Sequence, residues 1–150
     1  FPQRLDIINA GGFPVGVTLD NLLITPSTPR NRLLADVLQK TGLVERSGQG
    51  VDKIFYNTLS EGKSEPDYSK SDYFQVTLKL SAVIKDRAFA LFIDSIQKEL
   101  PEHKKLSVLE IITLNKIKKR SPKKGLDLEQ INKLLDKKLI ERRGKTNAVF

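Results

Sequence analysis

A group of lysine and arginine side chains near the C-terminus is the strongest candidate site in the sequence. Such side chains bind the phosphates of nucleic acids, so their density indicates a polyanionic partner. The residues expected to contact nucleic acid are Lys118, Lys119, Arg120, Lys123, Lys124, Lys133, Lys137, Arg142, Arg143 and Lys145. The other interpretation is a solvated surface whose charges only maintain solubility. The order of these residues, along one helix, a second helix and a terminal hairpin, favours DNA.

The charge balance along the chain supports the same interpretation. The 150 residues contain 26 Lys and Arg against 18 Asp and Glu, a formal net charge of +8. Basic and acidic residues are equal in number over residues 1–100, so residues 101–150 carry the whole surplus. Side chains suited to base edges are few there, since the second of these helices offers only Gln130 and Asn132. We therefore expect phosphate contacts to dominate.

A glycine-containing junction is a second candidate site. Arg46, Gly48 and Gly50 directly precede an apolar stretch with helical spacing. The N-terminus of a helix offers free amides and the positive end of its dipole to an anion such as phosphate. The alternative is a loop whose glycines only permit a positive φ, and the residues alone favour that alternative.

Patterns for catalysis, metal binding and membrane insertion are missing. The sequence has no Cys and a single histidine, His103, which lies between a proline and a lysine pair. Gly62-Lys63-Ser64 and Gly144-Lys145-Thr146 lack the earlier glycine of a Walker A motif, which excludes a motor of that type. No apolar run approaches the roughly 20 residues of a membrane span, and the N-terminus does not resemble a secretory leader. We expect no catalytic residue, no metal site, no membrane partner and a cytoplasmic protein.

Two segments of the first half have the alternating pattern of strands. They are Arg4–Asn9 and Tyr73–Leu80. In the second segment we expect the apolar side chains on one face, namely Phe74, Val76, Leu78 and Leu80.

Helical spacing of apolar residues predicts three helices before residue 101. The first covers about residues 32–41 after a cap at Asn31 or Ser27, and the second covers residues 51–59. The third covers residues 84–100 and ends at Pro101. Its apolar stripe is expected to consist of Ile84, Ala88, Leu91, Phe92, Ile96 and Leu100.

Two capping signals and a hairpin follow. Ser107 and Glu110 form a capping box that begins a helix ending near residue 119. Asp127 begins another helix, to about residue 139, and residues 140–150 have the pattern of strand, turn and strand. The inward side chains of the last helix are expected to be Leu128, Ile131, Leu134 and Leu135.

Three motifs, taken in order, resemble a known family. They are Asn9-Ala10-Gly11-Gly12-Phe13-Pro14, Pro29-Arg30-Asn31 and the segment Gly42–Val51. Over about residues 1–80 the chain is similar to the C-terminal region of bacterial transcriptional regulators with a schlafen-type, Alba-like N-terminal domain. These regulators carry the label "ATP-dependent DNA helicase RecG-related". Leu139–Lys145 also resembles the end of the winged-helix segment that often follows in this family.

The resemblance implies a GHKL-ATPase-like domain with two glycine boxes. The nucleotide or phosphate contacts that it implies are Gly11, Gly12, Arg46, Gly48 and Gly50. The first box usually begins with an aspartate that binds adenine, where this chain has Asn9 and Ala10. The asparagine that binds Mg²⁺ would lie upstream of Phe1, so ATP and Mg²⁺ are expected only in a longer protein and no cofactor in this chain alone. Because the sequence has no Met, we also expect upstream residues, with an N-terminal domain as a partner.

These observations predict an α+β chain, the remnant of a GHKL-ATPase-like α/β sandwich followed by a helical, winged-helix-like module. The expected parts are the RecG-related region 1–80, a connecting helix 81–103 and a DNA-binding module 104–150. The expected function is DNA binding in a transcriptional regulator, without motor or catalytic activity. Two alternatives stay open, namely an ATP-binding module of a helicase-related protein and a protein-interaction scaffold. A homo-oligomer is compatible with each of them.

Overall fold

The computed structural model describes residues 3–44, 48–120, 126–143 and 147–149. Helices and short antiparallel strands both occur, so the chain is α+β as expected. It packs as two compact units, the first of residues 1–58 and 63–85 and the second of residues 59–62 and 86–150. The expected boundaries at residues 80 and 103 remain predictions.

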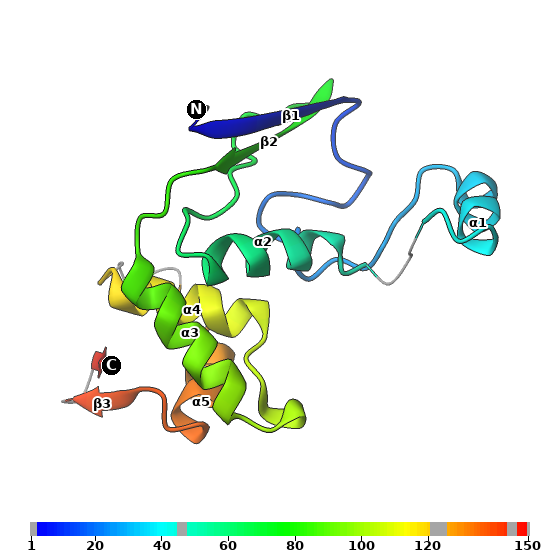
Figure 1. Ribbon diagram of the computed structural model, residues 1–150. Coiled ribbons are helices and arrows are strands. Elements are labelled where there is room, and N and C mark those ends of the chain that lie inside the picture. The colour runs from blue at the N-terminus through cyan, green and yellow to red at the C-terminus, as the bar shows by residue number, and fades with distance from the viewer. Residues whose placement is uncertain (1–2, 45–47, 121–125, 144–146, 150) are drawn as a thin grey trace. The chain divides into compact units, whose positions relative to one another are not determined.

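The sheet of the first unit consists of β1 (Arg4–Ala10) and β2 (Gln75–Ser81), which run antiparallel beside each other in Figure 1. Ile7 lies opposite Leu78 in this pairing. On the other edge of β2, Asp67 and Lys79 form an isolated bridge, in which each backbone amide donates to the other residue's carbonyl. Every residue of β1 is exposed, so the buried positions of this sheet lie on β2.

The predicted start of the second strand was two residues too early. Asp72 accepts hydrogen bonds through Oδ1 from the backbone amides of Phe74 and Gln75, at 2.8 and 2.9 Å. Residues 72–75 therefore form a side-chain turn, and the regular strand begins at Gln75. Phe74, expected to point inward, is instead 79% exposed and lies edge-to-face against exposed Tyr73.

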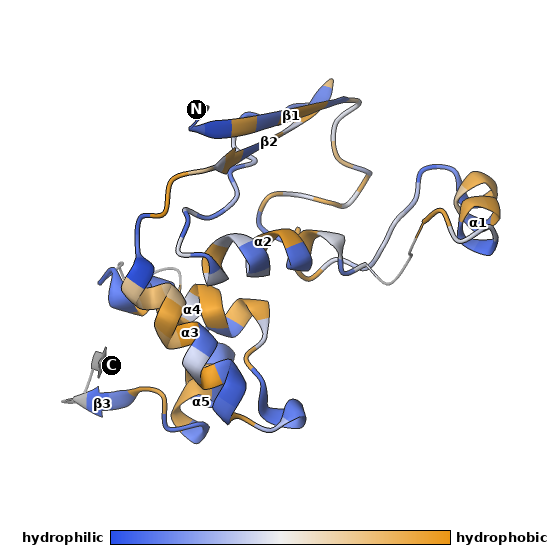
Figure 2. Cartoon of the chain, viewed as in Figure 1, coloured by the Kyte–Doolittle hydropathy of each residue, from blue (hydrophilic) through white to orange (hydrophobic). Residues whose placement is uncertain are grey.

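Two helices complete the first unit. α1 (Arg32–Lys40) is capped by Asn31, whose Oδ1 accepts from the Leu34 amide at 3.0 Å, and α2 spans Gly50–Ser60. Both predicted helices are therefore confirmed. No residue of α1 is buried, and its apolar stripe, which Figure 2 shows in orange, is exposed at Leu33, Leu34 and Val37.

The described part of the second unit contains three α-helices, a short 3-10 turn and two paired terminal strands. They are α3 (Arg87–Glu99), the short 3-10 turn η1 (Glu102–Lys104), α4 (Val108–Lys118), α5 (Leu128–Asp136), β3 (Glu141–Arg143) and β4 (Asn147–Val149). The predicted capping box is present at the start of α4, because Ser107 Oγ accepts from the Glu110 amide and the Glu110 carboxylate accepts from the Ser107 amide. The buried apolar side chains of these elements and their connections are Phe89, Ile93, Ile96, Leu106, Ile111, Ile112, Leu114, Ile117, Leu134 and Ile140.

The predicted inward face of α3 was right at Ile96 and wrong at Leu91. The helix begins at Arg87 after an Asp86 cap, and it buries Phe89, Ile93 and Ile96, whereas Leu91 is 62% exposed. Phe89, Ile93 and Ile96 follow the same i, i+4, i+7 spacing as the predicted stripe. The helix is therefore apolar on two adjacent faces. Tertiary packing decides which face is buried, and the spacing of apolar residues in the sequence does not report it.

The inward face of α5 also differs from the prediction. Leu134 is fully buried as predicted, but Leu128 is 74% exposed and Gln130, which was not predicted to point inward, is only 4% exposed. Leu128 is the first residue of the helix, directly after the Asp127 cap. Because Gln130 is buried, it is not available to base edges in this conformation.

Candidate functional site

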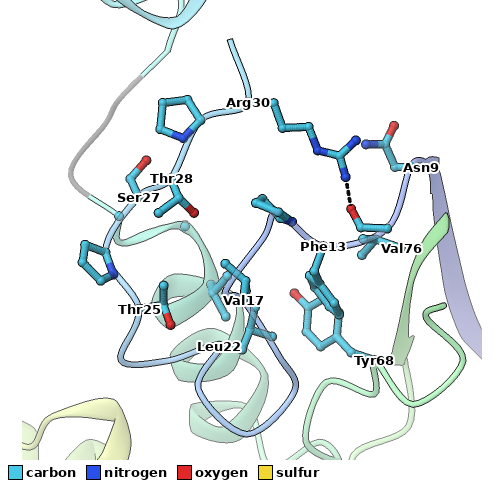
Figure 3. A pocket seen from close by; sticks show the side chains of 18 of the residues that line it. Asn9, Phe13, Val17, Leu22, Thr25, Ser27, Thr28, Arg30, Tyr68 and Val76 are labelled. Atoms are coloured by element: carbon cyan, nitrogen blue, oxygen red, sulfur yellow. Dashed lines mark hydrogen bonds between the residues drawn. The ribbon is translucent and has the colours of Figure 1, made fainter. Parts of the chain in front are cut away.

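The site of interest in the first unit is a cavity of about 700 Å³ (Figure 3). Its lining comes from the end of β1, the loop between β1 and α1, the start of α2 and two residues farther along the chain. The lining residues are Asn9, Ala10, Gly11, Gly12, Phe13, Pro14, Val17, Leu22, Thr25, Pro26, Ser27, Thr28, Pro29, Arg30, Gly48, Gly50, Val51, Tyr68 and Val76. The two glycine segments singled out from the sequence, about 37 positions apart, therefore meet at one cavity.

The first glycine segment is a tight turn against the backbone that leads into β2. The Gly11 amide donates to the Phe74 carbonyl at 2.6 Å, and the Gly12 amide donates to the Tyr73 carbonyl at 3.0 Å. A Cβ on Gly12 would lie 2.4 Å from the Asp72 carbonyl oxygen, so only glycine fits. These two amides are already paired, and Gly11 and Gly12 therefore shape the cavity wall rather than offer their amides to an anion.

The Arg30 side chain contacts the turn formed by Gly11 and Gly12. Its Nη2 donates a hydrogen bond to the Gly12 carbonyl, drawn as the dashed line in Figure 3. Gly11 has a φ of +84°, and a Cβ there would lie 2.6 Å from Arg30 Nη1. The missing side chain of Gly11 thus makes room for the guanidinium group.

The second glycine segment leads into α2. Gly48 has a φ of +75°, and a Cβ on it would lie 3.5 Å from the Ser27 amide nitrogen, across the cavity rim. The first hydrogen bond of the helix is donated by the Lys53 amide to the Gln49 carbonyl at 2.9 Å. The preceding amides of the first turn have no partner within the helix, and they make the start of α2 the positive end of its dipole.

An aromatic cluster forms another part of the wall. The ring of Tyr68 lies 6.2 Å from that of Phe13 and is stacked on that of Phe55 at 6.4 Å, measured between centroids. Burial raises the pKa of the Tyr68 phenol, so this side chain is neutral at physiological pH. The cavity therefore combines an apolar, aromatic part with the hydroxyl-bearing segment Thr25–Thr28.

Four of these lining residues are phosphate contacts predicted from the sequence, namely Gly11, Gly12, Gly48 and Gly50. Arg46, the fifth predicted phosphate contact, lies outside the described residues. Arg30 was missed as a site residue, since the motif that contains it was used only for the resemblance to the family. Its contact with Gly12 spans 18 residues, and no local pattern reports such a pair.

Two of the predicted nucleic-acid contacts are engaged inside the second unit. Lys137 Nζ lies 2.6 Å from Glu110 Oε1, with the two side chains only 18% and 3% exposed. Lys118 Nζ lies 2.7 Å from the Asp86 carboxylate and 5.4 Å from the centre of the Phe89 ring. A phosphate would have to replace these ion pairs.

The other predicted contacts are divided between the surface and undescribed parts of the chain. Lys119 and Arg120 are exposed at the end of α4, Lys133 pairs with Glu129 on the surface of α5, and Arg142 Nη2 donates to Asn132 Oδ1 at 3.2 Å. Lys123, Lys124 and Lys145 lie outside the described residues, and nothing is described of the Arg143 side chain. All of these contacts remain predictions.

Comparison with protein families identifies the first unit. Residues 1–78 match the family described as "Putative ATP-dependent DNA helicase recG C-terminal". The chain belongs to this family. The match supports the RecG-related, GHKL-ATPase-like expectation and covers both glycine segments and Arg30. A search of curated proteins found no match, and a search of solved structures found none either.

The described part of the chain has no feature of a membrane span or of a metal cluster. None of its helices has the length and apolar character needed to cross a bilayer. Nor do its His, Asp and Glu side chains gather in groups of three or more that could hold a metal ion. Among the described residues, the cavity lining has no carboxylate, the ligand that Mg²⁺ favours, and we assign no Mg²⁺ site to them.

Proposed function

We propose that the first unit is a nucleotide-binding module that takes ATP or a related nucleotide in the cavity. The observation that supports this proposal is the meeting of both glycine segments with the start of α2 at one cavity. A volume of about 700 Å³ is in the range of cofactor and ligand sites in proteins. The family match independently indicates an ATPase-like domain over the same residues.

Each part of a nucleotide finds suitable chemistry in the lining. Phe13 and Tyr68 offer an aromatic wall for the base. The Asn9 carboxamide has both a donor and an acceptor, as pairing with an adenine edge requires. The amides at the start of α2, which have no partner within the helix, favour phosphate. No lining residue is assigned a catalytic role, so the nucleotide acts here as a bound ligand.

The finer identity that we propose is the GHKL-like part of a transcriptional regulator of the RecG-related type. The bound nucleotide would then serve as a regulatory or structural ligand of the first unit. The RecG-related label of the family does not by itself require a motor in this chain.

Calorimetric titration with ATP tests the nucleotide proposal. Gly50 lines the cavity, has no positive φ, and a Cβ built there meets no atom within 4 Å. Gly50→Leu therefore adds bulk beside the first turn of α2 without a backbone clash. We expect it to weaken ATP binding at least about tenfold, which corresponds to roughly 1.4 kcal/mol. Asn57→Leu, on an exposed position of the same helix, is the matched control and should bind as the parent chain does.

DNA binding by the second unit is a second candidate function. The observation that favours it is a hairpin directly after α5, together with exposed basic residues at Lys119, Arg120 and Arg142. We propose a winged-helix-like contact in which these residues meet phosphates.

A titration of duplex DNA at several salt concentrations tests this candidate. For about five neutralised phosphates, log K should fall with log salt at a slope of about −4 to −5. Lys119→Ala should reduce the magnitude of the slope by about one, whereas Lys98→Ala, an exposed lysine on α3, should leave it unchanged. A flat salt response, or unchanged affinity after charge reversal at Arg142, would favour a protein-interaction scaffold instead.

A further inference from the structure

Arg30 is the only charged side chain among the described residues that line the cavity. The polar side chains beside it are neutral, since they are an asparagine, the hydroxyls of the segment Thr25–Thr28 and the Tyr68 phenol. No lysine, aspartate or glutamate occurs in this lining. Among the described lining residues Arg30 therefore has no carboxylate beside it, and an anion is the ligand group whose charge complements it.

The guanidinium group is held in position by neutral groups. The Gly12 carbonyl accepts from Nη2, and Gly11 leaves the space in which Nη1 lies. A guanidinium has five N–H donors, so one hydrogen bond to a carbonyl leaves most of the fork for a ligand. Figure 3 shows Arg30 beside Asn9 at the cavity edge, where it is accessible.

We infer that Arg30 is the residue that binds a phosphate group of the ligand and that it sets the preference for phosphorylated over unphosphorylated compounds. The inference rests on the proposed nucleotide-binding function and adds a residue to it. Phosphate and guanidinium form short, charge-assisted and often bidentate hydrogen bonds, about twice as strong as neutral ones. An entering phosphate therefore binds the free donors of the fork and competes with the Gly12 carbonyl for Nη2.

The test compares three ligands on the full 150-residue chain and its variants. ATP, adenosine and inorganic pyrophosphate are titrated calorimetrically, which separates a nucleotide phosphate from a free polyphosphate as the preferred source of the anion. Arg30→Ala removes the charge, and Arg30→Lys keeps the charge but not the fork. Arg32→Ala is the matched control, because Arg32 is exposed two residues away and does not line the cavity. Circular dichroism verifies that each variant is folded.

We expect Arg30→Ala to weaken ATP binding by about 10- to 100-fold and to change adenosine binding by less than about twofold. The ATP affinity of Arg30→Lys should lie between those of the parent chain and Arg30→Ala. Arg32→Ala should leave all affinities within about twofold. ATP binding that Arg30→Ala leaves unchanged would overturn the role of Arg30 while the nucleotide site stands. An equal loss for adenosine and ATP would overturn the assignment to phosphate. A parent chain that binds none of the three ligands would overturn both the inference and the proposed function.

Discussion

The ion pair between Lys137 and Glu110 leads to a specific prediction about the second unit. The two charges lie 2.6 Å apart, and the Glu110 side chain is 3% exposed. Lys137 Nζ also donates to the Lys105 carbonyl at 3.2 Å, and Glu110 at the same time caps α4. Lys137→Met keeps the length and apolar stem of the side chain but leaves a buried carboxylate without its cation.

The expected loss of stability depends on how deeply the Glu110 carboxylate is buried. Removal of one partner of a buried ion pair typically costs 3–5 kcal/mol, because the remaining charge stays desolvated. The Lys137 side chain is still 18% exposed, so water can reach the carboxylate, and we expect a loss of about 2–3 kcal/mol. Lys98→Met is the control, since Lys98 and Asp94 form an exposed pair whose loss should cost less than about 0.5 kcal/mol.

The assay is urea unfolding followed by far-ultraviolet circular dichroism, which suits a chain without Trp. The double variant Glu110→Gln/Lys137→Met should recover at least about 1 kcal/mol relative to the sum of the two single variants, because the uncompensated charge is gone. If Lys137→Met unfolds at the same urea concentration as Lys98→Met, the ion pair does not stabilise the unit. Lys137 would then again be available as a phosphate contact.

Two further predictions concern the same unit. Hydrogen bonds from Lys118 and from the Phe89 amide lower the pKa of Asp86. The ionised carboxylate therefore stabilises the fold at a pH above the unfolded-state pKa, which is near 4, and this contribution is lost as the pH falls through the lower folded-state pKa. Asp86→Asn can still cap α3, so it should lower the free energy of unfolding by at most about 1 kcal/mol at neutral pH. The variant should also lose less stability than the parent chain below about pH 4, which urea midpoints measured across pH would show. At the end of α4, Arg120 has a φ of 53° whereas neighbouring Lys119 has a φ of −74°. Because glycine tolerates a positive φ, Arg120→Gly should raise the free energy of unfolding by about 0.5–1 kcal/mol, whereas Lys119→Gly should lower it by a similar amount. If both variants change the free energy of unfolding in the same direction, backbone strain at Arg120 is not the cause.

The sequence predicted the start of a helix well where a capping side chain binds a residue only a few positions away. The Asn31 cap of α1 and the Ser107–Glu110 box of α4 each involve residues three positions apart, and both are present. The inward faces of α3 and α5 were less predictable. Leu91 and Leu128 have helical apolar spacing yet are exposed, because the choice of face depends on which other element packs there.

The candidate site was predictable in part. The glycine motifs identified Gly11, Gly12, Gly48 and Gly50, but not that the first two have paired amides and act as a wall. Arg30 and the ion pairs of the second unit depend on contacts between residues 18 to 32 positions apart. Contacts of this kind are set by the tertiary fold, which single-sequence patterns do not contain.

The most direct measurement of the central proposal is the change in backbone amide chemical shifts of the isotopically labelled chain when ATP is added. We expect the shifts to be concentrated at Gly11, Gly12, Gly48, Gly50 and Val51, and to saturate with a single dissociation constant. Shifts restricted to the basic surface of the second unit, or no shifts at millimolar ATP, would contradict nucleotide binding in the cavity.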